Sequence, residues 1–146
     1  MVDATAGLGE DSLLLAAAGF TVTMFERDSA IVALLRDALE RAADEPQLAG
    51  IVERMTLVEG DSVAGLRELS VPPDVVFLDP MFPERTKSAA VKKKFQLLHH
   101  LERPCEDEEG LLDAALAVRP RKVVIKRPAK GPWLRYDVIV PPPSSR

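Results

Sequence analysis

The sequence predicts an α/β domain in which helices cover both faces of a doubly wound, mostly parallel sheet. Apolar strand-like segments alternate with amphipathic helical segments along most of the chain. Residues 75–78 form an unbroken apolar run, which is typical of a central parallel strand covered on both faces. Residues 2–11 run from a strand end through a Gly-rich turn into a helix. This arrangement indicates a sheet whose carboxyl edge binds ligands.

Turn and capping residues separate the predicted elements. Asp28 or Ser29 caps a helix whose apolar side chains share one face, and Pro46 ends that helix. The expected strands are a first one that ends at Asp3 and belongs in the middle of the sheet, then 21–25, 55–59, 74–78, 122–126 and a last, antiparallel one at 136–140. The expected helices are 12–18, the one after Asp28, a short one through Leu66 and Leu69, 91–101 and 110–118. Residues 141–146 are predicted to be a disordered Pro/Ser tail.

Length and composition describe an ordinary globular domain. The chain has 146 residues, of which 47% are hydrophobic and 29% are charged, and this predicts one domain with one core. No apolar run approaches the ~20 residues that a membrane span needs, so we expect no membrane partner and a cytoplasmic location. Cys105 is the single cysteine, which excludes a disulfide framework within the chain and a cluster of cysteine metal ligands. We therefore expect no metal site.

A distinctive turn follows the apolar strand at 74–78. It reads Asp79-Pro80-Met81-Phe82-Pro83. The Asp79 carboxylate and the carbonyl group before Pro80 can accept hydrogen bonds from an exocyclic amine, and Phe82 can stack on a base. These features predict a site for the amino group of a nucleobase. The alternative is an Asx-type turn that only closes the strand.

The Gly-rich turn predicts a binding site for a cationic, nucleoside-containing cofactor. Gly7 and Gly9 allow close approach of a ligand to the backbone, and Glu26 ends the second strand, where an acid accepts hydrogen bonds from ribose hydroxyls. A dinucleotide fingerprint would need a third glycine where Ser12 stands. Acidic residues at positions 3, 10 and 11 would repel a phosphate but attract a sulfonium or ammonium group. S-adenosylmethionine fits this pattern and NAD does not. For Asp11 the alternative is a helix N-cap.

Charge is distributed unevenly along the chain. The formal net charge is −4, but residues 1–83 carry five arginines against fifteen acidic side chains. Basic side chains are concentrated after the Asp79 turn, in 84–103 and from residue 114 onward. This placement favours contacts with a nucleic-acid backbone beside the turn. For the run of lysines at 92–94 the alternative is a solvated helix face.

Several motifs together resemble one family. They are Asp3-Ala4-Thr5-Ala6-Gly7-Leu8-Gly9, Glu26-Arg27, the Asp79 turn, Lys87-Ser88-Ala89 with Val91-Lys92-Lys93, Lys126-Arg127-Pro128 and Arg135-Tyr136-Asp137. The sequence resembles the bacterial small-subunit rRNA guanine-N2 methyltransferases of the RsmJ family from residue 2 to about residue 140. The chain departs from that family in starting inside the first strand and in having a short connection at 129–134.

The resemblance implies a Rossmann-like class I methyltransferase fold over residues 1–140. It also implies methyl transfer from S-adenosylmethionine to the exocyclic N2 amine of a guanine in small-subunit rRNA, either free or in an assembling 30S particle. The residues expected to act on the guanine are Asp79, Pro80 and Phe82. Those expected to bind the cofactor are Asp3, Gly7, Gly9, Glu10, Asp11, Glu26, Arg27, Asp61, Ser62 and Asp79. Those expected to contact RNA are Lys87, Lys92, Lys93, Lys126 and Arg127.

Two other functions remain open at this stage. One is a methyltransferase that acts on a small molecule or on a protein amide, for which the Asp79 turn would serve equally well. The other is a non-catalytic fragment that binds S-adenosylmethionine. The sequence does not indicate an oligomeric state.

Overall fold

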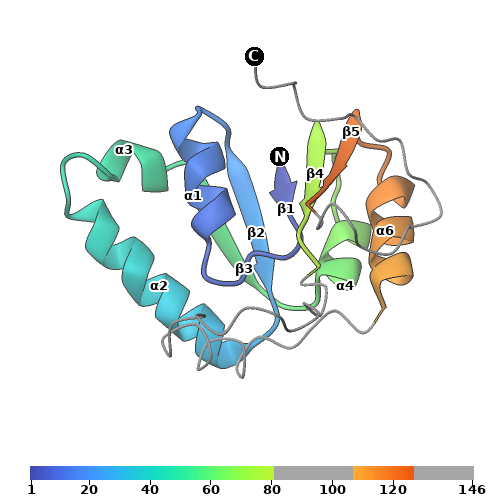
Figure 1. Ribbon diagram of the computed structural model, residues 1–146, viewed down its shortest axis with the longest axis horizontal. Coiled ribbons are helices and arrows are strands. Elements are labelled where there is room, and N and C mark those ends of the chain that lie inside the picture. Colours follow the sequence, from blue (N-terminus) through green and yellow to red (C-terminus); the bar gives the residue numbers. More distant parts are fainter. Residues whose placement is uncertain (81–106, 127–146) are drawn as a thin grey trace, which may run out of the picture.

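The computed structural model describes residues 1–80 and 107–126 of the chain (Figure 1). In these ranges the strands are β1 (Val2–Asp3), β2 (Val22–Glu26), β3 (Met55–Glu59), β4 (Val75–Leu78) and β5 (Lys122–Ile125). They form a five-stranded sheet in the order β3-β2-β1-β4-β5. Every neighbouring pair is parallel. The predicted class, a doubly wound parallel sheet, is confirmed.

Strand β1 occupies the centre of the sheet, as the sequence predicts. Val2 pairs with Thr23 on one side and with Val76 on the other. The first strand therefore has partners along both edges although it is only two residues long. Because β1 joins β2 to β4, the Gly-rich turn that follows it comes to lie beside the turn at Asp79.

Helices lie on both faces of the sheet (Figure 1). One face carries α1 (Glu10–Ala17), α2 (Ser29–Ala43) and the short α3 (Ala49–Val52), and the other carries α4 (Ser62–Arg67) and α6 (Glu108–Ala117). Each face has its own apolar core. Met24 and Leu35 belong to the core under α1 and α2. Leu66 and Leu111 belong to the core under α4 and α6.

The structure differs from the sequence prediction in several element bounds. Helix α1 begins at Glu10, two residues before the predicted start, and α4 ends at Arg67, before Leu69. Helix α3 was not predicted, because a four-residue helix shows no repeating apolar pattern. The predicted helix at 91–101, the predicted antiparallel strand at 136–140 and the predicted tail at 141–146 lie outside the described residues. Within 1–80 and 107–126, no helix is both long and apolar enough to cross a membrane.

Candidate functional site

The carboxyl ends of the parallel strands gather the candidate residues at one edge of the sheet. Asp3 ends β1, Glu26 ends β2, and Asp79 and Lys126 directly follow β4 and β5. Ligands bind at this edge in open α/β sheets, where loops from neighbouring strands meet. The described chain therefore brings together at one edge residues that lie far apart in the sequence.

Gly9 shapes the turn between β1 and α1. Its φ is 75°, in the left-handed region that favours glycine, and a Cβ atom at this position would lie 2.9 Å from Cδ1 of Leu35. Gly9 is also the N-cap of α1 and supplies no side-chain hydrogen bond. The N-cap interpretation of Asp11 is therefore wrong. Glu10 and Asp11 instead lie in the first turn of α1, where the helix dipole favours negative charge.

Asp3 is a buried carboxylate at the centre of the site, with 1% of its surface exposed. It accepts hydrogen bonds from Oγ of Ser12 at 2.5 Å and from the backbone N–H of Thr5 at 3.0 Å. Burial raises the pKa of the Asp3 carboxyl above its ordinary value, while these hydrogen bonds act in the opposite direction. The oxygens of Asp3 thus bond to the protein itself and connect the end of β1 to Thr5 in the turn and to Ser12 in α1.

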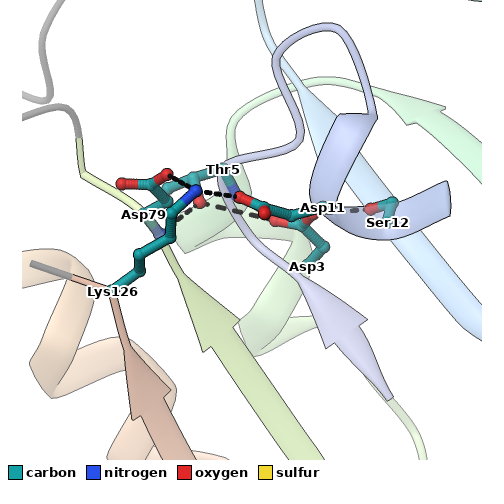
Figure 2. A network of polar contacts seen from close by, with 6 residues as sticks. All are labelled: Asp3, Thr5, Asp11, Ser12, Asp79 and Lys126. Carbon is teal, nitrogen blue, oxygen red and sulfur yellow. Dashed lines mark hydrogen bonds and ion pairs between the residues drawn. The ribbon is translucent and has the colours of Figure 1, made fainter. Parts of the chain in front are cut away.

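Thr5 connects Asp3 to the turn that follows β4. Its Oγ1 donates to Oδ1 of Asp3 at 3.4 Å and accepts from the backbone N–H of Asp79 at 2.6 Å (Figure 2). The backbone at Asp79 is therefore held from the neighbouring strand. Sequence reasoning missed the roles of Thr5 and Ser12, because nothing in their local pattern indicates partners so distant in the chain. Only the adjacency of β1 and β4 could have suggested the contact between Thr5 and Asp79.

Lys126 lies between two carboxylates (Figure 2). Its Nζ is 2.6 Å from Oδ2 of Asp11 and 3.0 Å from Oδ2 of Asp79. The hydrogen bonds that Lys126 donates raise the pKa of its ammonium group above the ordinary value, and the bond to Asp11 contributes more than the bond to Asp79. Lys126 was predicted to contact RNA, but the structure shows its ammonium group bound to the two acids.

Glu26 is held by two backbone N–H groups at the end of β2. Its Oε2 accepts from Gly7 at 3.0 Å, and its Oε1 accepts from Asp28 at 2.8 Å. Asp28 in turn caps α2 through hydrogen bonds from Ala30 and Ile31, as the sequence predicts. Glu26 therefore has a fixed orientation beside the Gly-rich turn. Arg27, the next residue, is exposed.

The loop after β3 joins the same edge. The backbone N–H of Gly60 donates to the carbonyl oxygen of Glu26 at 2.8 Å. Asp61 is the N-cap of α4 and accepts from the N–H of Ala64 at 2.9 Å, and Ser62 is the first residue of that helix. Asp61 and Ser62 thus lie just after β3, beside the end of β2 that carries Glu26.

The remaining predicted residues divide into two groups. Pro80 is buried directly after Asp79. Phe82, Lys87, Lys92, Lys93 and Arg127 lie outside the described residues. In the described ranges, no group of three or more His, Cys, Asp and Glu side chains is arranged to hold a metal ion.

The residues at this edge fit S-adenosylmethionine. Glu10, Asp11, Glu26 and Asp79 gather at this edge around the single positive charge of Lys126, so the net charge of the edge is negative and favours a cationic ligand. The carboxylate of Glu26 is oriented, and each of its oxygens can accept a second hydrogen bond, as ribose hydroxyls require. This donor and acceptor set suits a nucleoside with a cationic amino-acid end better than a pyrophosphate.

Comparison with known proteins supports the same family. A family model described as "Putative SAM-dependent methyltransferase" matches residues 1–139. This chain is 47% identical to the protein named ribosomal RNA small subunit methyltransferase J of Aeromonas salmonicida and 49% identical to that of Aeromonas hydrophila, each over 135 residues. Each match covers 92% of this chain and 54% of the relative, so the chain spans about half the length of these relatives.

A solved structure gives the same result for the fold. The crystal structure of a SAM-dependent methyltransferase from Neisseria gonorrhoeae superposes with a TM-score of 0.73 at 37% identity, covering 91% of this chain and 52% of the other. The Rossmann-like fold, the resemblance to the RsmJ family and the dependence of the family on S-adenosylmethionine are thus confirmed. The chain belongs to this family of SAM-dependent methyltransferases.

Proposed function

We propose that the protein transfers a methyl group from S-adenosylmethionine to the exocyclic N2 amine of a guanine in small-subunit rRNA. The observation that carries this proposal is the Asp79 carboxylate, which lies at the carboxyl edge of the sheet with its backbone N–H held by Thr5. Support for an rRNA substrate comes from the relatives, which are named as small-subunit rRNA methyltransferases. An rRNA substrate, free or in an assembling 30S particle, would agree with the cytoplasmic location that the sequence predicts.

Residues at the ends of three strands, β1, β2 and β3, would hold the cofactor. Glu26 would accept the ribose hydroxyls, and Asp61 with Ser62 would contact the exocyclic amine of the adenine. Glu10 and Asp11, at the start of α1, would bind the amino-acid end beside Gly7 and Gly9. Asp3 would keep the turn in shape through Thr5 and Ser12. When bound, S-adenosylmethionine supplies a methyl group that its sulfonium already activates.

The protein's contribution to the transfer is to position the guanine amine. The lone pair of this amine is delocalised into the ring, which makes it a poor nucleophile. An acceptor at Asp79 would orient the amine and stabilise the positive charge that develops on it. Within the described residues, Lys126 contacts Oδ2 of Asp79, and no hydrogen bond is made to Oδ1, which is the oxygen we assign to the amine. Buried Pro80 would fix the turn, and Phe82 would stack on the guanine.

Reaching this turn requires the guanine to leave its stack, which costs a few kcal/mol. Contacts between basic side chains and RNA phosphates would offset that cost. The residues we assign to these contacts are Lys87, Lys92, Lys93 and Arg127, which lie outside the described part of the chain.

Labelled methyl transfer tests the proposal directly. The chain is incubated with labelled S-adenosylmethionine and unmodified small-subunit rRNA, and the RNA is then digested to nucleosides. We expect N2-methylguanosine from the unchanged chain and at least a hundredfold less from Asp79→Ala, because the amine loses its acceptor. Cofactor affinity should change little in this variant.

Asp74→Ala is the matched control, since Asp74 precedes the same strand, is exposed and, among the described residues, forms an ion pair with Arg121 at the surface. This control should keep full activity. Retention of a tenth of the activity by Asp79→Ala would contradict the role of Asp79. Cofactor binding without any transfer by the unchanged chain would favour a non-catalytic binding function.

A further inference from the structure

The backbone of Lys126 is fixed beside Asp79. Ile125 of β5 pairs with Leu78 of β4, and the N–H of Lys126 donates to the carbonyl oxygen of Leu78 at 2.8 Å. Asp79 follows Leu78 directly. The lysine therefore starts from a strand that is hydrogen-bonded to the strand carrying Asp79, and its side chain also contacts Asp11 at the start of α1.

Negative charge is dense at this edge of the sheet. Asp3, Asp11 and Asp79 are connected in one polar network with Thr5, Ser12 and Lys126 (Figure 2). Asp11 is close enough to Asp3 to contribute to the raised pKa of the Asp3 carboxyl. Among the ion pairs of the described residues, the two that involve Asp11 and Asp79 are both made by Lys126. Without this ammonium group the carboxylates would repel one another and move apart.

The geometry does not suit a phosphate contact by Lys126. An ammonium group that already donates to two carboxylates has its charge compensated and two of its three N–H bonds occupied. A phosphate would have to compete with both acids. The bridge is therefore a better explanation of this residue than the RNA contact that the sequence predicted.

We propose that Lys126 is a positioning residue that holds the carboxylates of Asp11 and Asp79 in place for methyl transfer. This inference rests on the proposed function, because Asp11 is assigned there to the cofactor and Asp79 to the guanine. The ammonium group sets the distance between the two carboxylates and thereby the relative position of the cofactor's amino-acid end and the amine. It touches neither reacting atom.

Replacement of the charge tests the proposal against a phosphate contact. For Lys126→Met, which keeps most of the side-chain length, we expect kcat for rRNA methylation to fall at least tenfold. RNA affinity and its dependence on salt should stay unchanged. Lys126→Arg, which can still contact both acids, should recover much of the rate. Lys122→Met is the matched control, because Lys122 is an exposed lysine at the other end of β5, and it should leave kcat unchanged.

The opposite pattern would overturn the proposal. A phosphate contact predicts that Lys126→Met weakens RNA binding and lowers the slope of log affinity against log salt by about 1, with kcat intact. Equal activity of the Met and Arg variants would also overturn it, because the bridge requires a positive charge.

A titration that needs no activity tests the bridge itself. The pKa of the Lys126 ammonium is measured by NMR in the unchanged chain, in Asp11→Asn and in Asp79→Asn. We expect a raised value that falls in each variant, with the larger fall in Asp11→Asn. An ordinary value, equal in all three proteins, would show that the bridge is absent and overturn the proposal. A chain that shows the bridge but transfers no methyl group would refute the proposed function instead.

Discussion

Glu26 has two tasks at the level of a single residue. Its carboxylate oxygens accept hydrogen bonds from the backbone N–H of Gly7, in the turn after β1, and from that of Asp28, at the start of α2. The same carboxylate is the one that we assign to the ribose. Because the protein fixes its orientation before any ligand arrives, little side-chain entropy is lost on binding.

Replacement of Glu26 should therefore affect both binding and folding. We expect Glu26→Ala to weaken S-adenosylmethionine binding by about ten- to a hundredfold, through loss of charge-assisted hydrogen bonds. It should also lower the free energy of unfolding by about 1–3 kcal/mol, because two backbone N–H groups lose their acceptor. Calorimetric titration and urea denaturation measure the two effects.

Glu59→Ala is the control for this variant. Glu59 pairs with Glu26 in the β2–β3 register, but its carboxylate makes an exposed ion pair with Arg36. Such pairs contribute about 0–1 kcal/mol to stability, so the free energy of unfolding should change little. The affinity for S-adenosylmethionine should stay the same. Equal affinity of the Glu26 and Glu59 variants would contradict the assignment of Glu26.

The sequence indicates which residues reach the site better than it indicates what each one touches. Asp79, Glu26 and Asp11 were expected at this edge because strand ends and Gly-rich turns can be recognised locally. The contacts of Thr5 with Asp79 and of Lys126 with Asp11 join residues 74 and 115 positions apart. Partners of this kind depend on the order of strands in the sheet. Spacing along the chain does not reveal them, so the ion pairs of Lys126 were not predicted.

At the level of elements, Gly65 determines how closely α4 approaches β2. A Cβ atom on Gly65 would overlap the ring of Phe25, which is 5% exposed. The glycine thus allows the helix to pack directly on the aromatic ring. Phe25 precedes Glu26, so this contact also supports the strand end that carries the ribose acceptor.

Gly65→Ala should destabilise the protein by about 1–3 kcal/mol, because the added methyl group must displace either the ring of Phe25 or helix α4. Gly50→Ala is the matched control, since Gly50 lies in helix α3 and no atom of the described residues comes within 4 Å of the added Cβ. Alanine there should stabilise the protein by up to about 1 kcal/mol, as expected from helix propensity. Urea denaturation compares the two variants, and a shift of the same sign in both would refute the close packing at Gly65.

Strands flanked by turn residues were predicted well, and the starts of the helices α1 and α6 were each placed two residues too late. Strands β2 to β5 lie within one residue of their predicted bounds, because apolar runs flanked by turn residues are distinctive. The start of α1 was placed too late because its N-cap, Gly9, has no side chain that marks a helix start.

The whole molecule separates its acidic and basic parts. Residues 1–83, which carry most of the described sheet, are strongly acidic, and most basic side chains follow the Asp79 turn. RNA would be repelled by the first part and attracted by the second. Binding to RNA should therefore rest on the basic side chains after the Asp79 turn, and it should weaken as salt is added because each phosphate contact releases counterions.

We expect replacement of both Lys92 and Lys93 by glutamine to weaken RNA binding and to lower the slope of log affinity against log salt by about 2, because each lysine would neutralise one phosphate. Filter binding across a salt series measures this slope. Lys122→Gln, which removes a lysine from the described fold, should leave it unchanged. If the double variant kept the salt slope of the unchanged chain, Lys92 and Lys93 would not contact RNA phosphates.

The central position of β1 also has a consequence for folding. Val2 and Asp3 pair with Val76 and Phe77, so the middle of the sheet cannot close until β4 is available. Closing so long a loop is slow, whereas β2 and β3 can pair over a shorter stretch. The contacts from Thr5 to Asp79 and from Lys126 to Asp11 depend on this late step. We therefore expect the edge that we assign to methyl transfer to form after β2 and β3 have paired.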